Sequence, residues 1–197
     1  MHLLDARSGT VLHTVPVGLA ATAFAVDERT GQAFAANSHD STLRVLDGRR
    51  AAVVRTVALP WAPGALAVDE RTGDIVVANA YYNSVSLVEA ASGHVVRTVP
   101  LALPPRAIAV DQRRGRVLVL TREEFVPAAL AGQVQVLEGR TGRVLHTMAV
   151  GADASALALD ERTGKVFATT MNVYDLPAGS DSTGWLRAWL GRWLPRP

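Results

Sequence analysis

The chain has 197 residues, of which 49% are hydrophobic and 19% charged, so it is too apolar to be disordered and long enough for one well-buried domain. Its formal net charge of +2, without a Lys/Arg stripe, argues against nucleic-acid binding, and its lack of cysteine excludes disulfides and thiolate chemistry. No apolar run is long enough to span a membrane, and no charged-then-apolar signal pattern opens the chain, which as written is expected to stay cytoplasmic.

Two turn motifs alternate along the chain, and each pairs an acidic first residue with a small or glycine residue at its end. The first motif, Asp-Glu-Arg-Thr-Gly or a variant of it, begins at Asp27, Asp69, Asp111 and Asp160. The second begins at Asp5, Asp47, Glu89 and Glu138. Both series have spacings of 42, 42 and 49 residues, so the two motifs share one period and one seven-residue insertion. The chain is therefore built from an internally repeated unit.

Each unit contains four short runs rich in Val, Ile, Leu and Thr, too short for helices and favourable for strands. In the second complete unit the runs are 65–68, 75–79, 85–88 and 95–99. The acidic residue of each turn can accept hydrogen bonds from N–H groups two residues on, and the closing glycine accepts a positive φ. Four antiparallel strands repeated every 40 to 45 residues are typical of a propeller blade, whereas the competing β-solenoid has shorter coils.

The units predict an all-β propeller domain over residues 1–170 with about four four-stranded blades. In chain order they are a half unit at 2–18, complete units at 19–60, 61–102 and 103–151, and a half unit at 152–170. Two interpretations stay open: the half units pair and close the ring, or the chain is an open fragment of a larger propeller.

Residues 171–197 break the repeat and predict a short helical or irregular Trp-rich segment. Trp185, Trp189 and Trp193 fall on one side of a helical wheel. The favoured interpretation is a helical insertion that caps an open blade face. Two other interpretations stay open. One is a helix that binds a membrane surface or a partner, and the other is a divergent strand in which the sequence of residues 186–192 aligns with that of residues 43–49.

Four pieces of the second complete unit resemble the bacterial YVTN, or YncE-like, propeller repeat. They are LAVDERTG at 66–73, VVAN at 76–79, SVSLV at 84–88 and GHVVRTVP at 93–100. The resemblance runs from residue 2 to about 170. It implies the fold and little about function, because members have many or unknown roles. They commonly have about seven blades and are often exported, and this chain shows neither feature.

The search for catalytic chemistry yields no catalytic, metal or cofactor residue. The histidines form no ligand spacing, and no nucleophile elbow or phosphate-binding glycine loop is present. The four lead aspartates of the first motif are interpreted as turn caps rather than as a carboxylate ring, since an active site needs asymmetry. The sequence therefore leans away from an enzyme without deciding the matter.

Loops between the second and third strands of successive units gather on one face of a propeller, where ligands often bind. Paired tyrosines there are the strongest signal, although ordinary loop variability is the simpler explanation for each residue. The candidate binding residues are Asn37, His39, Tyr81, Tyr82, Asn83, Arg122 and Glu123, together with Trp185, Trp189 and Trp193.

These observations favour a non-catalytic scaffold that binds an unknown protein or small ligand through those loops. One alternative is a propeller enzyme of the lactonase or quinone-dependent dehydrogenase type, and another is a truncated remnant of a longer YncE-like protein. A homodimer with shared closure stays open, membrane contact by the Trp-rich segment is not favoured, and the compartment is undetermined because the family is often exported.

Overall fold

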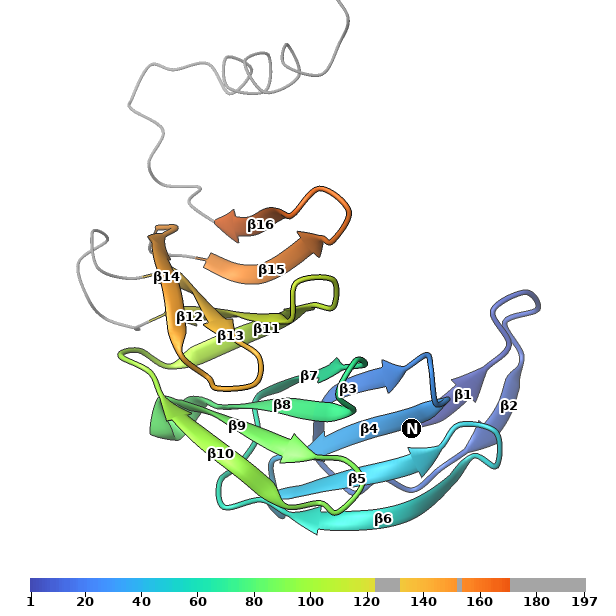
Figure 1. The fold of residues 1–197 in the computed structure, drawn as a ribbon. Coiled ribbons are helices and arrows are strands. Elements are labelled where there is room, and N and C mark those ends of the chain that lie inside the picture. Colours follow the sequence, from blue (N-terminus) through green and yellow to red (C-terminus); the bar gives the residue numbers. More distant parts are fainter. Residues whose placement is uncertain (123–131, 152–153, 171–197) are drawn as a thin grey trace, which may run out of the picture.

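The computed structural model describes residues 1–122, 132–151 and 154–170, and these form three four-stranded antiparallel sheets flanked by two two-stranded ones (Figure 1). We call the four-stranded sheets blades 1 to 3 and the two-stranded ones the first and last half-blades. The first half-blade is β1 (His2–Leu4) and β2 (Val11–Thr14), and blade 1 is β3 (Ala21–Asp27), β4 (Gln32–Asn37), β5 (Thr42–Asp47) and β6 (Ala52–Ala58).

Blade 2 is β7 (Ala65–Asp69), β8 (Asp74–Asn79), β9 (Ser84–Glu89) and β10 (Val95–Pro100), with the 3-10 helix η1 (Ala80–Tyr82) between β8 and β9. Blade 3 is β11 (Pro105–Asp111), β12 (Arg116–Arg122), β13 (Gly132–Glu138) and β14 (Val144–Ala149). The last half-blade is β15 (Ala154–Asp160) and β16 (Lys165–Thr170). The four predicted runs of the second unit fall within β7 to β10.

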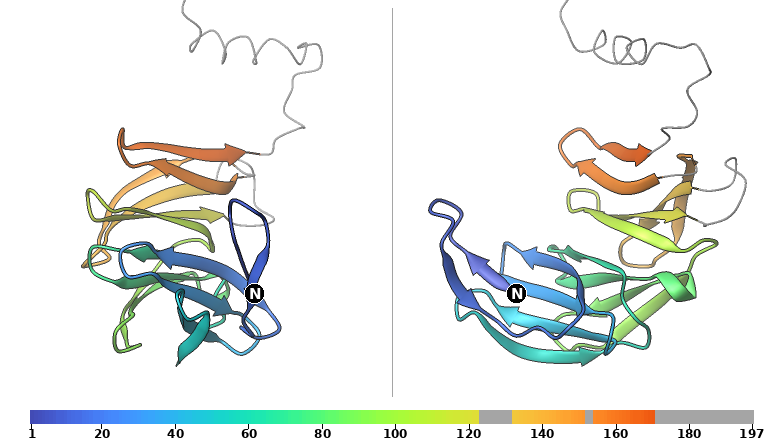
Figure 2. Two further views of the ribbon diagram at one scale, coloured as in Figure 1. Left: turned by 90° about the vertical axis from the view of Figure 1, so that its right-hand side faces the viewer. Right: turned by 180° about the vertical axis from the view of Figure 1, so that it is seen from behind.

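The blades follow one another as an open arc in which the innermost strands β3, β7, β11 and β15 are successive neighbours (Figure 1). The outer strands β6, β10 and β14 lie at the rim. The two half-blades stand at opposite ends of the arc, as both further views show (Figure 2). Within the described ranges they form two separate sheets. Among the described residues the half-blades do not pair with each other, so the sheets are not closed into a ring.

The core lies between consecutive blades, because each blade stacks its face on the next. Phe34 and Leu43 of blade 1 pack against Val68 and Ile75 of blade 2, and Val76 and Val85 of blade 2 continue the arrangement toward blade 3. Central strands are consequently buried on both faces and read as continuous apolar runs, as in QAFAAN of β4 and DIVVAN of β8. Outer strands such as β2 and β14 stay largely exposed.

The acidic turn residues cap their own hairpins, as predicted. In the β3–β4 turn, the Asp27 carboxylate accepts hydrogen bonds from the backbone N–H groups of Arg29 at 2.9 Å and Thr30 at 3.0 Å. Gly31 closes the turn with φ +72°, which a residue with a Cβ adopts only at a cost. Asp69, Asp111 and Asp160 accept equivalent bonds.

Acidic pH is expected to destabilise the fold through three exposed turn caps. Backbone N–H donors, Ser8 first for Asp5 and Arg50 first for Asp47, hold the pKa of each carboxyl below its usual value, and the Thr163 hydroxyl does so for Asp160. A carboxyl whose pKa is lower in the folded state stabilises that state above the unfolded pKa, about 3.9, and this contribution is lost as pH falls through the folded pKa.

Urea titrations at pH 7 and at successive values below 4 measure this effect as a falling free energy of unfolding. The triple variant D5N/D47N/D160N keeps the hydrogen-bond acceptors but cannot titrate, so its stability should depend less on pH than that of the wild type. Identical pH dependence in the two proteins would contradict the assignment.

Candidate functional site

Two sets of connections meet at one end of the blades, which we call the loop face. Ser38, after β4, donates its backbone N–H to the Ala20 carbonyl at 3.1 Å, and Leu101, after β10, donates to the Asn83 carbonyl at 2.7 Å. The loops between the second and third strands of a blade are thus tied to the segments that link one blade to the next. The acidic hairpin turns lie at the opposite end, which we call the turn face.

An aromatic cluster of Trp61, Tyr81 and Tyr82 stands on the loop face of blade 2. Trp61 belongs to the β6–β7 connection and is half-buried, and its ring centroid lies 3.8 Å from that of Tyr82 with the planes 31° apart. Tyr81 is 85% exposed and Tyr82 54% exposed. The tilted ring contact holds Tyr82 against Trp61, while the Tyr81 side chain extends into solvent.

The base of this cluster is built from a short 3-10 helix and buried hydrogen bonds. Tyr81 and Tyr82 occupy η1, and Asn83 ends it with a left-handed backbone, φ 43°. Beneath them the buried Asn79 amide donates hydrogen bonds to the Ser84 hydroxyl at 3.1 Å and to the Ser86 hydroxyl at 2.9 Å. Asn83, predicted as a binding residue, therefore shapes the turn that presents the two tyrosines.

The β4–β5 loop of blade 1 places its predicted site residues differently. Asn37 is 1% exposed, its side-chain oxygen accepts the His39 backbone N–H at 3.0 Å, and its side-chain amide donates to the Val17 backbone carbonyl at 3.4 Å. Asn37 therefore builds the loop and offers no surface to a ligand. His39 is exposed beside the ion pair of Asp40 and Arg44, whose charged atoms are 3.4 Å apart.

Of the remaining predicted residues, the structure describes only Arg122. Arg122 is half-buried at the end of β12, where its backbone N–H donates to the Pro104 carbonyl at 2.9 Å. Glu123, Trp185, Trp189 and Trp193 lie outside the described residues. The sequence did not single out Trp61, because it follows the outermost strand of blade 1 and the candidate loops all lay inside a unit. Its position between Pro60 and Pro63 was the one sign in the sequence that it belongs to an exposed connection.

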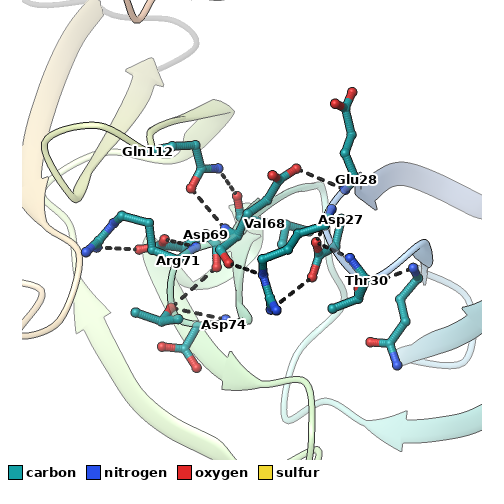
Figure 3. Close-up of polar contacts among 12 residues, drawn as sticks. Asp27, Glu28, Thr30, Val68, Asp69, Arg71, Asp74 and Gln112 are labelled. Carbon is teal, nitrogen blue, oxygen red and sulfur yellow. Dashed lines mark hydrogen bonds and ion pairs between the residues drawn. The ribbon is translucent and has the colours of Figure 1, made fainter.

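The turn face connects one blade to the next through polar contacts of the repeated motif (Figure 3). The Glu70 carboxylate accepts the Glu28 N–H at 3.1 Å, and the Glu70 N–H donates to the Gln112 side-chain oxygen at 2.9 Å. The Gln112 amide in turn donates to the Val68 carbonyl at 2.7 Å. Side chains one repeat apart thus join three successive turns, which explains why the motif recurs in every unit.

The described residues contain neither a metal-binding cluster nor a membrane-spanning helix. No group of three His, Asp or Glu side chains in residues 1–122, 132–151 and 154–170 is arranged to hold a metal ion. In the same ranges, no helix has the length and apolar character needed to cross a membrane.

Comparison with known proteins identifies the architecture. Neither a protein-family model nor a curated protein sequence matches the chain. Among solved structures it is similar to hydrazine synthase of Kuenenia stuttgartiensis, with a TM-score of 0.73 over 91% of this chain. The chain has a β-propeller-like fold. Sequence identity is 17%, so the likeness shows the fold alone. This chain spans 51% of the length of the hydrazine synthase chain.

Proposed function

We propose that this chain is a non-catalytic propeller scaffold of the YVTN or YncE-like type, which binds a protein or small ligand through the aromatic cluster on its loop face. The observation that carries the proposal is the pairing of a highly exposed Tyr81 with a Tyr82 that is held against Trp61. The repeat residues LAVDERTG and GHVVRTVP support the family assignment.

Tyrosine suits such a contact because its ring offers a large area while only two side-chain torsions lose freedom on binding. The hydrogen bonds of Asn79 below η1 and the turn at Asn83 define the backbone that carries both tyrosines, and such preorganisation lowers the cost of binding. The exposed His39 and the neighbouring ion pair of Asp40 with Arg44 supply polar contacts on the same face. A ligand with an apolar or planar part flanked by polar groups fits this surface.

The other interpretations of the sequence stay hypotheses. No contact among the described residues favours an enzyme of the lactonase or quinone-dependent type. That the chain is a remnant of a longer YncE-like protein stays a hypothesis, as does its compartment.

Replacing both tyrosines with alanine is expected to weaken binding at least about tenfold without unfolding the protein, because buried aromatic anchors carry about 1–2 kcal/mol or more each. A displayed peptide library is panned on the wild type, and each binder's dissociation constant is measured for the wild type and for Y81A/Y82A. The matched control is Val96→Ala, which shortens a side chain that is 63% exposed on the outer strand of the same blade.

Thermal unfolding followed by circular dichroism checks that Y81A/Y82A folds like the wild type. The single variant Tyr82→Phe, which keeps the ring against Trp61, should retain most of the affinity. If every peptide selected on the wild type binds Y81A/Y82A with the same dissociation constant, the site assignment is wrong.

A further inference from the structure

Both ends of the arc leave core positions uncovered. At the first end, Leu4 is 54% exposed, although the same repeat position is at most 2% exposed in the complete blades, where it holds Leu46, Val88 and Leu137. At the last end, Phe167 is 53% exposed, although its counterparts Phe34, Val76 and Leu118 are at most 3% exposed. Within the described residues each half-blade has two strands instead of four, and this leaves these side chains exposed.

A second apolar surface lies beside the first half-blade, on the inner strand of blade 1. Phe24 and Val26 of β3 are each 48% exposed, whereas Leu66 and Val68 at the same positions of β7 are 8% and 6% exposed. Together with Met1 and Leu3 they line an apolar hollow of about 140 Å³. In blade 2 the corresponding face is covered by the inner strands of blade 1, so the hollow marks where an inner half-blade would pack.

The two half-blades supply complementary halves of one blade. The last half-blade contributes strands one and two, and the first contributes strands three and four. In every complete blade the second strand pairs with the third in the same register, for example Gln32 with Asp47 and Arg116 with Glu138. Applied to the half-blades, this register places Lys165 opposite Asp5.

The register also gives a favourable match for its first three pairs. The facing residues at its start carry opposite charges, as they do for Arg116 and Glu138 of blade 3. The next two pairs along the strands are apolar, Val166 with Leu4 and Phe167 with Leu3. Pairing would therefore bury the two most exposed core positions and satisfy both open strand edges.

We propose that two copies of this chain associate head to tail, with β16 of each copy pairing with β1 of the other. Both half-blades are then completed, and β15 of one copy covers Phe24 and Val26 of its partner. Three blades from each copy and two shared blades give a closed ring of eight, within the range of about four to eight blades known for propellers. Three copies would exceed that range, and a single chain keeps its half-blades apart (Figure 2).

The chain has no cysteine, so single introduced cysteines test the contact directly. The register places His2 opposite Ala168, and we expect H2C and A168C, purified separately, mixed and mildly oxidised, to form a covalent dimer of twice 20.9 kDa. Each variant alone should give about tenfold less dimer, because two-fold symmetry puts identical residues at opposite junctions. The matched control is H2C mixed with T169C, since adjacent residues of a strand point to opposite faces and cysteine is close to threonine in size.

Equal dimer yields from the mixed, unmixed and control reactions would overturn the proposal, as random collision would explain them. The double variant H2C/A168C tests for closure within one chain. If its disulfide forms inside monomers at high dilution and no dimer appears at any concentration, the proposal is also contradicted. As a second readout, Lys165→Glu is expected to raise the dimer dissociation constant about two- to fivefold by placing like charges opposite each other.

Discussion

Replacing Phe34 with alanine is expected to lower the free energy of unfolding by about 3–5 kcal/mol, the largest effect of any single substitution considered. Phe34 is 1% exposed at the centre of β4, where it packs between blade 1 and blade 2. The substitution removes the ring from the core and leaves a cavity that the surrounding sheets can fill only in part. Domains of this size are stable by about 5–15 kcal/mol, so a large share of the stability would be lost.

Urea unfolding of the full chain, followed by circular dichroism, measures this loss. The control is Val54→Ala on the outer strand β6 of the same blade, whose side chain is 52% exposed and whose truncation should change stability by no more than about 0.5 kcal/mol. Equal midpoints for F34A and V54A would show that blades 1 and 2 do not stack through Phe34.

Replacing Asp69 with alanine is the second large effect, about 2–3 kcal/mol. The Asp69 side chain is buried, accepts the Arg71 N–H at 3.1 Å and lies 3.0 Å from the Arg71 guanidinium. Alanine leaves that N–H without its acceptor and removes the charge that faces Arg71. The conservative variant Asp69→Asn keeps an acceptor and should lose less.

The repeat provides a matched comparison, because Asp160 caps the same turn in the last half-blade. Among the described residues no further blade of the same chain covers that carboxylate, so in the single chain its hydrogen bonds compete with water and Asp160→Ala should cost clearly less than Asp69→Ala. The comparison is made at a dilution at which the chain is monomeric, because a head-to-tail partner would cover this turn. The two variants are compared by urea unfolding under identical conditions. Equal losses in the free energy of unfolding would mean that burial between blades does not increase the stability that the turn cap contributes.

The strands and turns were predictable because both depend on local sequence. The aspartate caps, the closing glycine at Gly31 and the apolar runs of β7 to β10 are each specified within a few residues. Whether the ring closes was not predictable, because the rotation between neighbouring sheets depends on how side chains such as Phe34 and Ile75 pack across blades. Local sequence carries little information about that angle.

The candidate site was predictable only in part, for a similar reason. Tyr81 and Tyr82 stand out in the sequence as paired aromatics in a loop, and the structure exposes both. Their stacking partner Trp61 comes from a segment on the far side of β7 and β8 in the chain, so only the folded arrangement brings it to Tyr82. The burial of Asn37 likewise depends on Val17, twenty residues earlier.

The mass of the purified chain in solution, measured by light scattering after size exclusion, tests most directly whether the arc is completed by a second copy. The head-to-tail ring predicts a mass of twice 20.9 kDa at micromolar concentration, falling toward the single-chain value in a Phe167→Asp variant that keeps the wild-type circular dichroism spectrum. A mass of 20.9 kDa for the wild type at every concentration would contradict it.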